Sequence, residues 1–134
     1  MYGGMIVSAI PFQIEGEYGT RYIREKGGLG GINLATPELD KLYCGNSSVT
    51  DSTKAILIIN FPSKKIIGYE ITSENGFSKK DIIVELSKAY AEIYKNKKKY
   101  EICCDKLSDL ELKSIVVFKV GQRIYLESEV SSKK

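Results

Sequence analysis

Basic and aromatic residues gather in two segments of this chain, and both carry chemistry that suits a polyanion. The first segment contains five such residues: Tyr18, Arg21, Tyr22, Arg24 and Lys26. The second contains four lysines: Lys95, Lys97, Lys98 and Lys99. Lysine and arginine bind phosphates, and aromatic rings stack on bases. Protein interfaces are also enriched in tyrosine and arginine, and a solvated surface explains both segments without any partner.

Catalytic chemistry is restricted because the 134-residue sequence contains no histidine. Histidine is the usual general acid or base near neutral pH, and it activates serine and cysteine nucleophiles. A nucleophile at Cys44 or Cys103 would therefore have no imidazole to activate it. Zinc could be held only by cysteines and carboxylates, and no CxxC spacing occurs. We expect no catalytic residues, no metal site, no cofactor and no enzyme activity.

The three cysteines are Cys44, Cys103 and Cys104, so at least one thiol is unpaired within the chain. We expect buried or half-buried free thiols, and a disulfide from Cys44 to Cys103 or Cys104 remains geometrically open. The first residues lack a secretory signal pattern, and no run approaches the ~20 apolar residues that span a bilayer. We expect an intracellular protein that is neither secreted nor bound to a membrane.

Glycine is dense between residues 16 and 36, and we expect a long Gly-rich loop there. The run Gly27-Gly28-Leu29-Gly30-Gly31 could form an anion-binding nest of backbone amides. It lacks both the GxxxxGK[ST] and the GxGxxG spacing, so it indicates neither a phosphate loop nor a dinucleotide site. Loops of this length in compact domains are often either functional or disordered.

Size and composition predict a single domain that covers residues 1–134. Hydrophobic residues make up 43% of the chain, which suffices for one ordinary core. The net charge of +3 is a mild basic excess, weaker than that of dedicated nucleic-acid binders. Composition therefore leaves nucleic acid open as a partner without requiring it.

A helix from Lys79 to about Tyr94 is the clearest element that must position these residues. Ser78 is a typical N-cap, and Asp81 three residues later can complete a capping box. Apolar residues then recur at helical spacing: Ile82, Leu86, Ala89, Tyr90 and Ile93. The lysine cluster follows directly, where cations complement the helix dipole.

The remaining elements are expected to be mainly extended. Predicted strands cover 5–10, 55–59, 66–72, 110–120 and 123–127, and strand 55–59 is expected to be buried on both faces. Residues 100–104 also have a strand-like pattern, with Tyr100, Ile102 and Cys104 at alternate positions. Gly121-Gln122 fits a two-residue hairpin loop. A short helix is expected over 37–43, after Thr36 as its N-cap. The tail over 128–134 is expected to fray. The predicted fold class is α+β, with an antiparallel or mixed sheet of about five strands and one long amphipathic helix packed on one face.

One pattern within residues 61–126 is structural rather than catalytic. It consists of Phe61-Pro62, Ile67-Gly68-Tyr69-Glu70-Ile71, Gly76-Phe77-Ser78, Asp81-Ile82-Ile83, Tyr90, and the run from Leu110 to Leu126 with its Gly121 turn. This pattern resembles small uncharacterised α+β proteins of large DNA viruses of amoebae. The resemblance implies a viral protein in the host cytoplasm or the virion, and it carries over no catalytic residues.

Two functions are compatible with these residues. The first hypothesis is a non-enzymatic protein–protein interaction or structural module, which contacts a partner or a second copy of itself through the loop from Tyr18 to Gly31. The resemblance would make it a virion or virus-factory component. The alternative is a nucleic-acid-binding accessory protein that uses the basic and aromatic loop and the lysine cluster. Steeply salt-dependent binding to nucleic acid would favour the alternative.

Overall fold

The computed structural model describes residues 5–12, 31–42, 44–102 and 105–132. Its strands are β1 (Met5–Pro11), β2 (Ile32–Asn33), β3 (Ser48–Thr50), β4 (Lys54–Ile59), β5 (Ile67–Thr72), β6 (Phe77–Ser78), β7 (Leu110–Val120) and β8 (Arg123–Ser132). The helical elements are α2 (Lys79–Lys95) and the two 3-10 turns η1 (Leu39–Lys41) and η2 (Leu107–Asp109). The described chain is therefore α+β.

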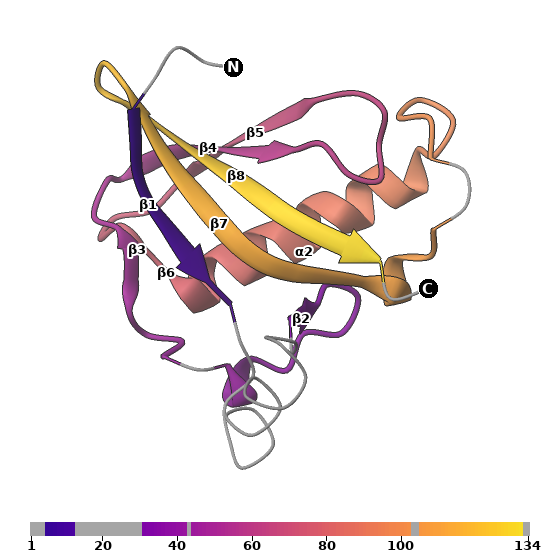
Figure 1. Cartoon of the computed structure of the whole chain (residues 1–134), viewed down its shortest axis with the longest axis horizontal. Coiled ribbons are helices and arrows are strands. Elements are labelled where there is room, and N and C mark those ends of the chain that lie inside the picture. Colours follow the sequence, from indigo (N-terminus) through magenta and orange to yellow (C-terminus); the bar gives the residue numbers. More distant parts are fainter. Residues whose placement is uncertain (1–4, 13–30, 43, 103–104, 133–134) are drawn as a thin grey trace.

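The larger sheet has six strands in the order β1-β7-β8-β4-β5, with the short β2 pairing to β7. Its neighbouring strands are antiparallel except β4 and β8, which run parallel. The sheet is therefore mixed. A second sheet consists of β3 and β6. α2 lies across one face of the larger sheet, and its C-terminal end comes close to the turn between β4 and β5 (Figure 1).

α2 begins with the capping box that the sequence predicts. The side chain of Ser78 accepts a hydrogen bond from the Asp81 backbone N–H, and the Asp81 carboxylate accepts one from the Ser78 backbone N–H. The helix extends for 17 residues and ends at Lys95, one residue beyond the predicted boundary. Its buried face includes the whole predicted apolar stripe together with Ile83.

The hydrophobic core lies between this helix and the larger sheet. Leu57 and Ile59 of β4 and Leu126 of β8 are fully buried, and they belong to the same cluster as Leu86 and Tyr90 of α2. The predicted burial of 55–59 is confirmed, because four of its five residues are buried and Ile56 is half-buried. The core therefore forms where the strand pattern and the helix stripe meet.

The β7–β8 hairpin confirms the predicted two-residue loop. Val120 pairs with Arg123, and Gly121 between them adopts a φ of 61°. A side chain there would be strained, because L-residues rarely occupy the left-handed region. The short loop fixes the register of the longest strand pair in the molecule.

Several local predictions were wrong. β8 continues to Ser132 and pairs with β7 as far as Leu110, so residues 128–132 are part of the sheet and not a frayed tail. The helix expected over 37–43 is reduced to the 3-10 turn η1, because Leu42 returns to extended backbone. The extended segment predicted from residue 100 does not form a strand among the described residues, because Tyr100 lies in a turn.

The expected loop over 16–36 is only partly described. Ile32 and Asn33 form β2 and pair with Leu112 and Glu111 of β7, so this end of the predicted loop belongs to the sheet. The Asn33 side chain then accepts hydrogen bonds from the backbone N–H groups of Ala35 and Thr36. The chain is thereby turned away from the sheet by a side-chain turn rather than by a helix cap at Thr36.

Candidate functional site

The first predicted binding segment lies outside the described residues. This applies to Tyr18, Arg21, Tyr22, Arg24 and Lys26, and to most of the Gly-rich run that follows them. The predictions made on these residues stay predictions. The second segment, from Lys95 to Lys99, is described in full.

The lysine cluster occupies the end of α2 and the turn that follows. The backbone N–H of Asn96 bonds the Ile93 carbonyl oxygen at 3.0 Å and closes the helix. The N–H of Ile102 then reaches back to the Lys97 carbonyl oxygen at 3.0 Å, and that of Tyr100 to the Asn96 carbonyl oxygen at 3.2 Å. All four predicted lysines are exposed, and this hydrogen-bonded turn fixes the backbone that carries Lys97, Lys98 and Lys99.

The fold adds two lysines that the sequence analysis did not include. Lys64 and Lys65, both exposed, lie in the turn between β4 and β5. The hydroxyl of the buried Ser63 is 2.9 Å from the Tyr100 carbonyl oxygen and 3.0 Å from the Lys65 carbonyl oxygen. Its single hydrogen is shared between these two acceptors. The Ser63 hydroxyl oxygen also accepts a hydrogen bond from the Lys65 backbone N–H at 3.0 Å. Ser63 therefore joins the two lysine-bearing turns.

We call this surface the basic end, defined by Lys64, Lys65, Lys95, Lys97, Lys98 and Lys99. Its two segments, 61–66 and 92–101, contain six lysines against two glutamates, an excess of four positive charges on a chain whose net charge is +3. None of the six ammonium groups forms an ion pair with a carboxylate in the part of the chain that the structure describes. The positive charge of the basic end is therefore not neutralised locally.

Two tyrosine rings lie within the basic end, and each is covered by a lysine. The Lys97 ammonium is 5.5 Å from the centroid of the Tyr94 ring, and the Lys99 ammonium is 5.3 Å from that of Tyr100. Both rings also pack against the hydrophobic core. Each cation–ring contact contributes about 0.5–1 kcal/mol at exposed sites, so these contacts favour the folded position of the two lysines.

Two tyrosine hydroxyl groups near the basic end have raised pKa values. Burial, together with the nearby carboxylates of Asp105 and Asp109, raises the pKa of Tyr94 to about 12. Burial also raises the pKa of Tyr69, with Tyr100 and Glu92 contributing. Lys97 therefore lies over a neutral Tyr94 ring at neutral pH.

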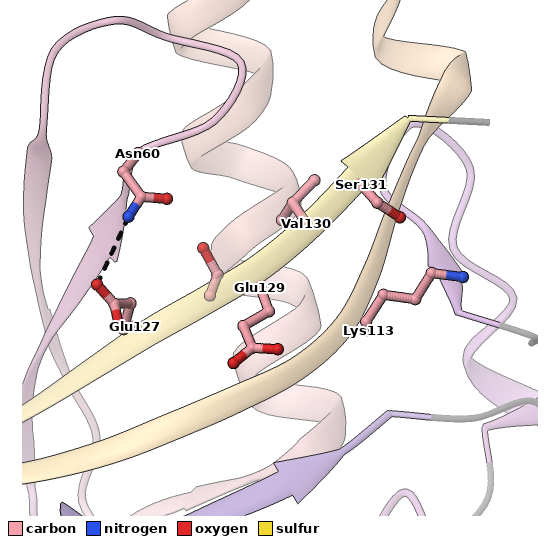
Figure 2. Close-up of a pocket in the computed structure, with 7 residues that line it drawn as sticks. Asn60, Lys113, Glu127, Glu129, Val130 and Ser131 are labelled. Carbon is pink, nitrogen blue, oxygen red and sulfur yellow. Dashed lines mark hydrogen bonds between the residues drawn. The ribbon is translucent and has the colours of Figure 1, made fainter. Parts of the chain in front are cut away.

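A hollow that carries two glutamates adjoins the C-terminal end of β4. It has a volume of about 340 Å³ and is lined by Asn60, Lys113 and residues 127–131 of β8 (Figure 2). The Asn60 side-chain amide donates to the Glu127 carboxylate at 3.5 Å. The Lys113 ammonium bonds the Glu111 carboxylate at 3.2 Å. The hollow thus offers carboxylates at the edge of a strand, and among the described residues no group of three or more possible metal ligands gathers here or elsewhere.

The described residues add one fact on the cysteines. Cys44 is a free thiol and is exposed, so the expectation of a buried or half-buried thiol was wrong for this residue. Cys103 and Cys104 lie outside the described residues. Cys44 follows η1 and contacts Ser47, whose hydroxyl donates to its carbonyl oxygen at 2.8 Å.

No helix within the described ranges is both long enough and apolar enough to cross a bilayer. A comparison of the chain with protein-family models, with curated proteins and with solved structures gave no match. The resemblance to viral proteins therefore stays a prediction, and any function must be argued from the residues themselves.

Proposed function

We propose that the protein is a non-enzymatic binding module whose partner is nucleic acid, held at the basic end. The observation that carries this proposal is the tertiary pairing of Lys64 and Lys65 with the lysines that follow α2. One sequence cluster of four lysines becomes a surface of six, assembled from two turns that Ser63 holds together. Unpaired lysines on a fixed surface attract a polyanion, because each phosphate contact releases condensed counterions.

Binding to labelled nucleic acid tests this proposal directly. A 20-base-pair duplex in a fluorescence-anisotropy titration should bind at 50 mM salt and weaken by roughly 10³-fold at 200 mM if all six lysines contact phosphates. The variant Lys65→Gln with Lys98→Gln should lower the salt slope by about 2 and weaken binding by roughly tenfold.

The matched control changes the same charge elsewhere. Lys54 begins β4 and Lys119 lies beside the β7–β8 loop, at the opposite end of these strands from the turn at Ser63, and both are exposed. The variant Lys54→Gln with Lys119→Gln should bind almost as the parent protein does. Equal loss in the two variants would mean that net charge alone drives binding, and an absence of binding to the duplex at 50 mM salt would end the proposal.

A second candidate is the protein–protein or structural module expected first from the sequence, which a viral origin would place in a virion or virus factory. β5 supports it, because this strand forms an outer edge of the larger sheet and pairs only with β4 among the described strands. Ile66, immediately before β5, is 71% exposed. An open edge next to an exposed apolar side chain favours strand addition by a second copy.

Size-exclusion chromatography with light scattering separates the two candidates. The second candidate predicts a dimer or larger assembly in the absence of nucleic acid, and Ile66→Gln should shift it towards monomer. The control Val84→Gln, at an exposed apolar residue of α2 rather than of the sheet edge, should leave the assembly intact. A parent protein that is monomeric at high concentration would exclude self-association through β5.

A further inference from the structure

We propose that the basic end binds the phosphate backbone of nucleic acid and not its bases, so that base stacking adds nothing to the affinity for either paired or unpaired strands. This inference rests on the proposed function and names the chemistry of the same site. It follows from the contacts of the aromatic side chains in the two segments of the basic end, which would otherwise stack on bases. Phe61 is half-buried against the hydrophobic core, and two tyrosine rings remain to be considered.

Both rings already have contacts that compete with a stacked base. Tyr94 and Tyr100 are half-buried and pack against the hydrophobic core, and the ammonium groups of Lys97 and Lys99 stand over the rings at 5.5 and 5.3 Å. A base could stack only by displacing a lysine, which would cost both the cation–ring contact and a phosphate contact. The Tyr94 hydroxyl is also engaged, since it donates to the Asp105 carbonyl oxygen at 3.1 Å.

The arrangement of the lysines fits a row of phosphates better than one phosphate. The six exposed side chains come from the end of α2 and from two turns. The four lysines at the helix end line an open hollow of about 510 Å³, which does not enclose a single anion. A nucleic-acid duplex presents one negative charge per ~1.7 Å of axis, which can engage several spread ammonium groups at once. Lysine, as a flexible point charge, makes such contacts without selecting a base.

An anionic membrane surface is the rival partner for the same charge. Ile66 is the one large apolar side chain beside the basic end that is strongly exposed among the described residues. A membrane-surface element buries a whole apolar face alongside its charges, and a single isoleucine does not supply one. Because the basic end has charge but no apolar face beside it, nucleic acid is favoured over a membrane as its partner.

The test compares four ligands with the intact chain at 50 mM salt. They are a 20-base-pair duplex, a mixed-sequence single strand of 20 nucleotides, an abasic strand of the same length, and vesicles containing phosphatidylserine. We expect the abasic strand to bind within about threefold of the mixed single strand, since base stacking would contribute ~1–3 kcal/mol per base. The duplex should bind at least as tightly as either strand, because its salt slope is steeper.

The outcomes separate this inference from the function on which it rests. Loss of affinity of tenfold or more for the abasic strand would overturn backbone-only recognition while leaving nucleic-acid binding in place. Binding to vesicles that exceeds binding to the duplex, and that Ile66→Gln abolishes, would overturn it in favour of a membrane partner. Failure of every nucleic-acid ligand to bind would remove the proposed function itself.

Discussion

The two ends of α2 differ in what occupies their free backbone groups. At the N-terminal end, the Lys79 N–H bonds the Ser47 carbonyl oxygen at 3.1 Å, and the Lys80 N–H bonds the Gly45 carbonyl oxygen at 3.0 Å. The capping box satisfies the N–H groups of Ser78 and Asp81. At the C-terminal end the chain turns back on itself and exposes lysines.

This difference shows which end can bind an anion. A helix N-terminus attracts anions through its free N–H groups and its positive dipole end. Here those N–H groups already have protein partners, and the Asp81 carboxylate already lies beside them. The C-terminal end is unfavourable for anions by its dipole, yet it carries the lysines. Side-chain charge, rather than the helix backbone, therefore makes the candidate site.

Among substitutions near the two ends of α2, Ser63→Ala is expected to have the largest effect, on both stability and duplex affinity. The substitution removes the hydroxyl that joins the two turns of the basic end and leaves the Tyr100 carbonyl oxygen without this donor. Loss of a buried hydrogen bond costs about 1–3 kcal/mol. Chemical denaturation should show that loss, and duplex affinity should fall although no charge changes. Unchanged affinity would mean that the two turns bind independently.

Ser78→Ala is expected to have a smaller effect, confined to stability. It removes one half of the capping box, and loss of an N-cap side chain costs about 0.5–2 kcal/mol. Duplex affinity should stay the same. Lys98→Ala at the other end should show the reverse, with stability changed by less than about 0.5 kcal/mol and affinity lowered. A loss of affinity in Ser78→Ala would show that the two ends are coupled.

The effect expected to be smallest at neutral pH is one that appears only under alkaline conditions. Because the folded pKa of Tyr94 is raised to about 12, against about 10 in an unfolded chain, its stabilising contribution is complete below pH 10 and is lost as pH rises through about 12. Denaturation midpoints from pH 9 to 12 should therefore fall more steeply in the parent protein than in Tyr94→Phe. Identical slopes would show that Tyr94 is not shielded by burial.

Elements set by neighbours in sequence were predictable. The Ser78–Asp81 box, the buried stripe of α2 and the Gly121-Gln122 loop each depend on residues within one or two turns of chain, and the structure confirms them. The short helix over 37–43 failed for a local reason that was overlooked. Only Leu39–Lys41 form a 3-10 turn, because Leu42 returns to extended backbone, and the N–H groups of Ala35 and Thr36 bond the Asn33 side chain ahead of it.

Element lengths allow the extra lysines to join the basic end but do not require it. A six-residue strand spans roughly 20 Å and a 17-residue helix roughly 25 Å. β5 leads away from the turn at Lys64 and Lys65, and α2 leads back over a similar length. The only sequence signal was two adjacent lysines between two predicted strands, and the direction of the helix across the sheet is set by the packing of the core.

The amino-acid sequence by itself determined the position of the helix, its capped start, its apolar face and the lysines at its end, because these depend on short-range spacing. Tertiary structure decided that β4 pairs in parallel with β8, that β8 continues to Ser132, and that Lys64 and Lys65 join Lys95 to Lys99. Those features depend on segments about 20 to 70 residues apart, whose pairing is chosen by burial of the whole core. No local pattern encodes that choice.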